Sequence, residues 1–285
     1  MGVFSRYVDL QWEQTMSEAA QTYQAISLVI EDRVARLTLN RPETLNALND
    51  AMFHEIPLAV ADACTAGARA LLLTGAGRAF CSGADLVGGL NFPSGLSEAQ
   101  REILNRALFE KVISTVRALN EAPMPVVCAI NGVAAGGGVG LALAGDVVLM
   151  AASARLVLTF VPKLGLAPDV AATWLMSRLA GRAKTLGASL LGDAISAADA
   201  DRWGLVYRVI DDASFMAEAE AIAHRLAAGP QRAVQGTRRL VDAAPKMALA
   251  EHILLERDIQ APLLGGPDST EGVQAFREKR APRFA

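Results

Sequence analysis

Reactive side chains are scarce in this sequence of 285 residues, which contains 3 Cys, 3 His and 5% aromatic residues. The cysteines Cys64, Cys81 and Cys128 are isolated and odd in number, so they offer neither a disulfide framework nor a CxxC metal site. His54-Glu55 begins like the HExxH motif of zinc proteases, but Leu58 stands where the second His should be. The residues therefore predict no metal site.

Clustered charge and long apolar runs are also lacking. The 27 basic and 30 acidic residues give a net charge of −3 without a Lys/Arg run, which argues against a nucleic-acid partner. The stretch from Leu141 to Ala154 is interrupted by Gly145-Asp146 and falls short of the roughly 20 apolar residues that span a bilayer. Residues 1–24 contain no apolar signal core, so we expect an N-terminal extension, no membrane association and a cytoplasmic location.

Hydrophobic patterning is abundant, because 52% of the residues are hydrophobic. Apolar runs typical of strands alternate with helical patterns, which predicts an α/β fold with crossover connections. Beyond about residue 210 the chain becomes Ala/Leu-rich and helical, so we expect a core at 25–210 and a helical region at 211–285. The expected strands are 25–30, 33–39, 70–73, 126–130, 146–150 and 205–210, and the longer helices before residue 169 are 46–63 and 96–119.

A glycine-rich segment, Gly136 to Gly140, follows the buried strand 126–130 and leads into a short helix at 141–144. A turn of this kind presents unpaired N–H groups at a helix N-terminus, where they can hold an anion or a developing oxyanion. A tight turn that allows close helix packing explains the same residues. Both interpretations stay open from the residues alone.

A second small-residue segment, Phe80 to Leu86, follows the strand at 70–73. Gly83 would let a ligand approach the backbone closely. A nucleophilic Cys81 would need a nearby base, and no His lies close in sequence. We therefore expect Cys81 to be a small buried residue.

Several ordered motifs carry a resemblance to a known family. They are LNRP (39–42), LNAL (45–48), LLLTGAGRAFCSGADL (71–86), NGVAAGGGVGLALAGD (131–146), LGLAPD (164–169) and EGVQAFREKRAPRF (271–284). Together, over about residues 25–283, they resemble the enoyl-CoA hydratase/isomerase (crotonase) superfamily. The pattern is most similar to the ring-1,2-epoxyphenylacetyl-CoA isomerases and related enoyl-CoA isomerases.

The resemblance implies a fold and a chemistry. The fold is a spiral of ββα units with a helical C-terminal trimerisation region, assembled as homotrimers or hexamers. The substrate is an acyl-CoA thioester, so CoA enters with the substrate and no separate cofactor is implied. The thioester oxygen is expected between the backbone N–H groups of Ala84 and Gly137, which stabilise an enolate-like charge.

Departures from the family pattern narrow the reaction. The two glutamates of the hydratases fall on Gly140 and near Val161, or on Pro162 or Lys163 if a gap is moved. None of these is a carboxylate, so water addition would lack its acid and base. The segment that begins at Phe160 also has one residue more than is usual in the family.

Asp169 matches the aspartate that the isomerases use as a base, and we expect it to be the acid–base residue. The alternative is an N-cap for a helix over 170–179, since Asp is a preferred cap. Val170, Ala171 and Ala172 stand where the subgroup usually has glycines, which would narrow the pocket or move the helix start.

The resemblance also implies CoA-binding residues. The C-terminal pair Phe276 and Lys279 would reach the CoA of a neighbouring subunit, although a helix face with one aromatic and one solvated cation explains them equally well. The remaining candidates, expected along the CoA channel, are Thr44, Leu45, Ala47, Asp85 and Leu86.

The sequence thus predicts an acyl-CoA isomerase that rearranges a double bond or a ring epoxide, as in fatty acid metabolism or phenylacetate degradation. One alternative is an enoyl-CoA hydratase or a hydrolase-like relative whose acid–base group comes from elsewhere. Another is a non-catalytic acyl-CoA-binding or scaffold protein, which the missing glutamates favour and the retained Asp169 opposes.

Overall fold

The computed structural model describes residues 23–88 and 95–284. Its larger sheet has six strands in the order β1-β2-β3-β5-β7-β10. Only β1 runs antiparallel to its neighbour, forming the expected hairpin with β2, and the other strands are parallel. Their bounds are β1 Ile26–Glu31, β2 Val34–Leu39, β3 Ala70–Gly75, β5 Val126–Ile130, β7 Val147–Ala151 and β10 Arg208–Ile210.

The central strands are buried on both faces, as their unbroken apolar sequences predict. Every residue of β3 and β5 is buried. Continuous runs of this kind are typical of parallel strands that are covered on both sides. This is why the expected strand 126–130 coincides with β5.

A smaller sheet contains strands that the sequence analysis did not predict. β4, β6 and β8 each follow a strand of the larger sheet after a few residues and pair in parallel with one another. The resulting strand–strand–helix unit recurs along the chain, so the α/β spiral is confirmed. The strands are β4 Ala79–Cys81, β6 Val133–Ala135, β8 Arg155–Val157 and β9 Ile195–Ser196, in the order β4-β6-β8-β9.

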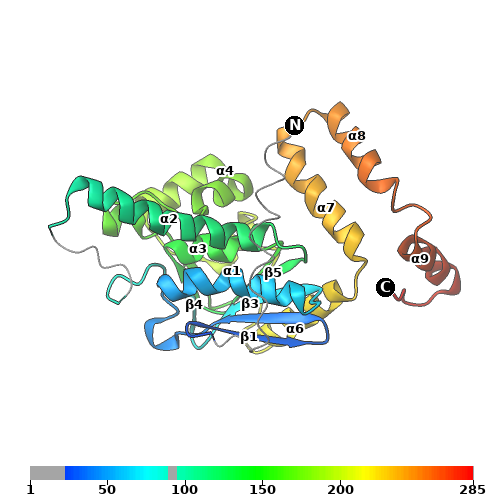
Figure 1. Cartoon of the computed structure of the whole chain (residues 1–285), viewed down its shortest axis with the longest axis horizontal. Coiled ribbons are helices and arrows are strands. Elements are labelled where there is room, and N and C mark those ends of the chain that lie inside the picture. Colours follow the sequence, from blue (N-terminus) through cyan, green and yellow to red (C-terminus); the bar gives the residue numbers. More distant parts are fainter. Residues whose placement is uncertain (1–22, 89–94, 285) are drawn as a thin grey trace.

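Helices cover both faces of the larger sheet (Figure 1). On one side, α1 packs against α2, and α3 packs against α4, while α6 lies against β3 and β5 on the other side. The Asn49 side chain caps α1 by accepting a hydrogen bond from the N–H of Met52. The helices in this body are α1 Asp50–Thr65, α2 Glu98–Asn120, α3 Gly137–Leu143, α4 Ala172–Leu191, α5 Ala197–Arg202 and α6 Phe215–Ala227.

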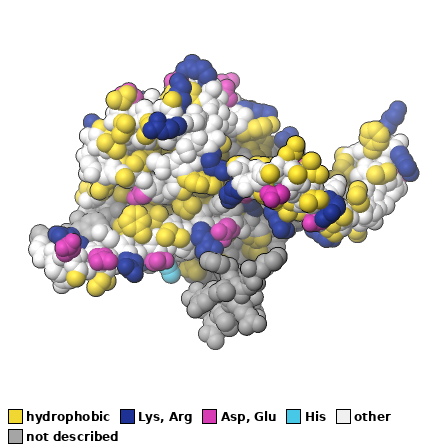
Figure 2. Space-filling view, turned by 90° about the horizontal axis from the view of Figure 1, so that it is seen from above, with side chains coloured by type: hydrophobic (Ala, Val, Ile, Leu, Met, Phe, Trp, Pro, Cys, Tyr) yellow, Lys and Arg dark blue, Asp and Glu magenta, His cyan; other side chains and the backbone are white. Residues whose placement is uncertain are grey.

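The last three helices extend away from this body as an arm (Figure 1). They are α7 Gln231–Ala243, α8 Leu249–Gln260 and α9 Pro267–Glu278. Hydrophobic side chains lie open on the arm, including Leu249 and Phe276, which are 75% and 85% exposed. Figure 2 shows hydrophobic side chains interspersed with charged ones on the arm. The helical C-terminal region is therefore observed, and its first helix, α6, packs on the sheet.

Some expected features shift or lie outside the described residues. The helix expected at 46–63 begins at Asp50, and the strand expected at 205–210 is confined to Arg208–Ile210. Of the expected extension at 1–24, only Tyr23 and Gln24 are described. In the described ranges, no helix combines the length and apolar character needed to cross a membrane.

Candidate active site

Two glycine-containing turns meet where the two sheets adjoin. Gly83 has a φ of +91°, and a Cβ placed on it would lie 2.7 Å from the carbonyl oxygen of Ala135 and 3.4 Å from Cα of Gly136. Gly136 itself has a φ of +53° at the N-cap of α3. Glycine is favoured at both positions by the positive φ, and at Gly83 a side chain would also clash with the backbone of Ala135. The turn before Ala84 thus packs directly on the turn before Gly137.

The N–H groups of Ala84 and Gly137 are left without an acceptor. Gly137 is the first residue of α3, so no intrahelical carbonyl reaches its amide. Ala84 forms a single parallel bridge with Leu48, in which the Leu48 N–H donates to Gly83 O at 2.7 Å and the Asp85 N–H donates to Leu48 O at 2.9 Å. Neither the Ala84 nor the Gly137 amide donates to another residue within the described ranges. Both can therefore donate a hydrogen bond to an incoming oxygen.

Asp169 lies beside Gly137. A Cβ placed on Gly137 would lie 3.6 Å from Oδ1 of Asp169 and 3.3 Å from Cδ1 of Leu48. Leu48 also pairs with Ala84, so Leu48 neighbours both Ala84 and Gly137, and Asp169 neighbours Gly137. The structure thus brings together residues from three distant segments.

The carboxylate of Asp169 is not a helix cap. Helix α4 begins at Ala172, its N-cap position is Ala171, and no side chain caps it, so the capping alternative is wrong. Burial raises the pKa of the Asp169 carboxyl, and its own backbone N–H opposes this rise. No charged side chain in the described ranges contributes to the shift. A half-buried carboxylate with a raised pKa is a stronger base than an exposed one, and it can both accept and return a proton.

The positions of the missing glutamates hold no replacement. At Gly140, a Cβ would lie 1.8 Å from the carbonyl oxygen of Val170, so no side chain fits there. Val161, Pro162 and Lys163 are exposed in the π-helical turn η2, Phe160–Leu164. None of these residues places a second carboxylate beside Asp169.

The expected CoA-binding residues fall into two separate groups. Residues 44–47 run beside 82–85, since the Ser82 N–H donates to Leu45 O at 2.9 Å and its hydroxyl donates to Thr44 O at 3.0 Å. Ala47 is buried and Leu86 is 53% exposed. Phe276 and Lys279 lie on the arm, in α9 and at its C-cap. Their role in binding CoA stays a prediction.

Asp85 has a structural task that sequence reasoning missed. Its carboxylate is 2.8 Å from the guanidinium of Arg41, and both side chains are largely buried. It also accepts the N–H groups of Gly88 at 2.7 Å and Val87 at 3.3 Å. The Gly88 hydrogen bond and then Arg41 lower the pKa of this carboxyl. The Asn-Arg-Pro turn that contains Arg41 is visible in the sequence. Its pairing with Asp85 could not be inferred, because the two residues lie far apart along the chain.

The cysteines behave as the sequence predicts. Cys81 is fully buried in β4, where a Cβ placed on Gly138 would lie 2.5 Å from its carbonyl oxygen. Burial raises the pKa of its thiol to about 12. It is therefore protonated and inert.

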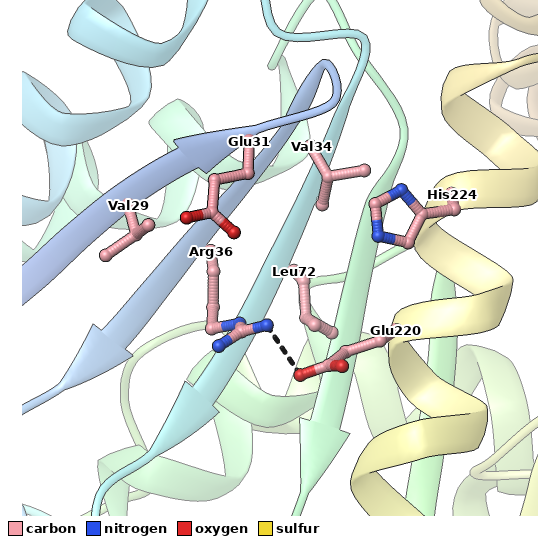
Figure 3. A pocket seen from close by; sticks show the side chains of 7 residues that line it. All are labelled: Val29, Glu31, Val34, Arg36, Leu72, Glu220 and His224. Carbon is pink, nitrogen blue, oxygen red and sulfur yellow. Dashed lines mark ion pairs between the residues drawn. The ribbon is translucent and has the colours of Figure 1, made fainter.

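Two hollows elsewhere hold no reactive arrangement. The one in Figure 3, about 30 Å³, lies between strands β1 and β2 and helix α6, and its Arg36–Glu220 ion pair of 2.6 Å is partly exposed. The other, about 480 Å³, lies at the carboxyl ends of β3, β5 and β7. Its Asn131 amide is bonded to the Gly75 backbone. In residues 23–88 and 95–284, no group of three or more His, Cys, Asp or Glu could hold a metal ion.

Comparison with known proteins agrees with the fold. The family model described as enoyl-CoA hydratase/isomerase matches residues 29–285. The chain belongs to the enoyl-CoA hydratase/isomerase family.

Its relatives include both kinds of enzyme. The chain is 41% identical over 256 residues to the 1,2-epoxyphenylacetyl-CoA isomerase of Escherichia coli, covering 90% of this chain and 96% of that one. It is 40% identical over 263 residues to a probable enoyl-CoA hydratase of Rhodobacter capsulatus, covering 92% and 98%. The crystal structure of an enoyl-CoA hydratase from Bacillus anthracis matches with a TM-score of 0.82 and 32% identity, covering 92% and 99%.

Proposed function

We propose that the protein is an acyl-CoA isomerase in which Asp169 moves a proton while the N–H groups of Ala84 and Gly137 hold the thioester oxygen. The observation that carries the proposal is the position of the Asp169 carboxylate next to Gly137, with Oδ1 3.6 Å from the Cβ position of that residue. A base beside the oxyanion donors faces the carbon next to the polarised carbonyl. The relative in Escherichia coli, named as an isomerase of an epoxyphenylacetyl thioester, supports the same class of reaction.

For a 3-enoyl thioester, the steps balance with one carboxylate. Asp169 removes a proton from the carbon next to the carbonyl, and the electron pair of that C–H bond moves into a dienolate. The charge on oxygen is stabilised by the two amides, and one such donor typically contributes about 3 kcal/mol of barrier lowering. The protonated Asp169 then returns the proton to the γ-carbon, which gives the conjugated 2-enoyl thioester.

The lack of a second carboxylate favours isomerisation over hydration. Water addition needs one group to activate water and another to deliver a proton. Gly140 has no room for a side chain, and Val161 to Lys163 are exposed. We therefore propose isomerisation rather than hydration, with a ring-epoxide thioester as a second substrate class.

The further parts of the proposal concern CoA and assembly. We propose that the CoA part of the substrate lies along Thr44 to Ala47 and residues 85–86. We also propose a homotrimer or hexamer in which Phe276 and Lys279 approach the CoA of a neighbour. The high exposure of Phe276 supports this assignment.

The test is turnover of three thioesters by the purified protein: a 3-enoyl-CoA, a 2-enoyl-CoA and a ring-1,2-epoxyphenylacetyl-CoA. Asp169→Asn keeps the shape and removes the base, so we expect double-bond migration to fall by at least about 10²-fold. Asp193→Asn, at an exposed carboxylate, is the matched control and should retain activity. Water addition to the 2-enoyl-CoA that persists in Asp169→Asn would contradict the proposal, and binding without turnover of any thioester would favour a scaffold.

A further inference from the structure

Val170 follows the proposed base and has an unusual backbone. Its φ is +48°, and that of Ala171 is +57°. A β-branched residue rarely adopts the left-handed region, because its side chain crowds the backbone. Such strain persists only where the surrounding structure holds it, and it concentrates at functional sites.

The contacts that hold Val170 are those around the site. It is 4% exposed. The carbonyl oxygen of Val170 lies only 1.8 Å from the position that a Cβ on Gly140 would take. Its Cγ2 lies 2.8 Å from the Cβ position of Gly137. Val170 thus packs directly on α3 at Gly137 and Gly140. Any residue larger than glycine at these two positions would clash with it.

We propose that Val170 is the positioning residue for Asp169: locked between Gly137 and Gly140 in a left-handed turn, it fixes the carboxylate beside the oxyanion amide. The inference rests on the proposed function, since Asp169 is the group being placed. The chain reverses between Asp169 and α4, and the Ala172 N–H donates to Asp169 O at 3.0 Å. A turn closed this tightly fixes the backbone of Asp169 and so restricts the direction in which its side chain leaves the chain.

Ala171 provides a matched comparison. It has the same left-handed backbone, but the atoms closest to Gly137 and Gly140 belong to Val170, Leu48 and Asp169. Glycine at 171 relieves strain and removes none of the atoms closest to the Cβ positions of Gly137 and Gly140. Glycine at 170 relieves strain and also removes the side chain that packs over Gly137.

The test compares Val170→Gly, Val170→Ala and Ala171→Gly. We expect Val170→Gly to lower kcat of double-bond migration by at least about tenfold with KM within about threefold, because displacement by about 1 Å can cost 10²-fold. Val170→Ala should lower kcat by a smaller factor, and it replaces Val170→Gly in the comparison if the glycine variant does not fold. Ala171→Gly should stay within about twofold.

A second readout needs no turnover. The pKa of Asp169 is followed by NMR of protein labelled with ¹³C at the aspartate carboxyl, and Asp169→Asn assigns the signal. In Val170→Gly the carboxyl gains water, so its pKa should fall toward the ordinary value of about 3.9, while Ala171→Gly leaves it unchanged.

The two proposals fail in different ways. A wild-type protein that turns over no thioester defeats the isomerase assignment, and the NMR comparison still tests the placement of Asp169. Wild-type kcat and pKa in Val170→Gly, or equal losses in Ala171→Gly, would overturn the role of Val170.

Discussion

The ion pair between Arg41 and Asp85 should be among the strongest single contacts that hold the Ala84 turn. The two side chains are 17% and 6% exposed and lie 2.8 Å apart. Arg41 also donates to Ala47 O at 2.7 Å. Removing one partner of a buried pair leaves an uncompensated charge and typically costs about 3–5 kcal/mol. We therefore expect Asp85→Ala or Arg41→Ala to lower the free energy of unfolding by about that amount.

The assay is a double-mutant cycle by urea unfolding at one fixed protein concentration. The coupling between Arg41 and Asp85 should exceed about 2 kcal/mol, since neighbours in a buried network couple strongly. The pair Arg117–Glu121 on α2 is the control, because its side chains are 60% and 59% exposed. An exposed pair of this type contributes about 0.3–0.5 kcal/mol. Equal coupling in the two pairs would refute the reasoning.

The same pair predicts a pH dependence. The pKa of Asp85 is lowered, first by the Gly88 N–H and then by Arg41. Its contribution is therefore complete above the ordinary carboxyl pKa of about 3.9 and is lost as the pH falls through the lowered value in the folded state. The stability difference between wild type and Asp85→Asn should shrink below about pH 4.

Two shorter predictions concern the glycine turn and the cysteines. Gly83→Ala should lower the free energy of unfolding by about 1–3 kcal/mol and reduce turnover, because φ is +91° and the new Cβ would lie 2.7 Å from Ala135 O; unchanged melting and activity would contradict this. Iodoacetamide at pH 8 should modify only the exposed Cys64, since burial raises the pKa of Cys81 and Cys128 to about 12. Mass spectrometry of the native protein checks this, and rapid labelling of Cys81 would disprove its burial.

The central sheet could be predicted from the sequence, whereas the small sheet could not. Strands such as β5 are apolar throughout, and a doubly covered parallel strand requires that composition. β4, β6 and β8 have three residues each, too few to show an alternating pattern, and they pair with one another. Tertiary contacts decide such short strands, because β-propensity depends strongly on context.

The start of α3 shows the same limit in a helix. The glycine run suggested a turn with the helix beginning at Leu141, because glycine disfavours helix interiors. The helix begins at Gly137 instead. At Gly138 and Gly140 a Cβ would meet backbone of β4 and of Val170. Packing therefore requires glycine where local propensity opposes it.

The residues of the candidate site could be predicted from motifs, whereas the backbone that positions them could not. Ala84, Gly137 and Asp169 are marked by the family pattern, and in the structure Leu48 neighbours Ala84 and Gly137 while Asp169 neighbours Gly137. The sequence predicts extended backbone at Val170, because a β-branched residue favours that conformation. Its left-handed turn follows only from the glycines of α3, which lie far away in the sequence.

The environment of Asp169 connects this turn to the chemistry. No charged side chain of the described residues alters its pKa, so burial is what raises it. The further proposal assigns part of this burial to Val170, whose side chain packs over Gly137. The left-handed conformation costs about 1–2 kcal/mol for a residue that is not glycine, and Val170 adopts it. In the proposed isomerase, the single acid–base residue is thus placed by the strained backbone of Val170 rather than by a charged partner.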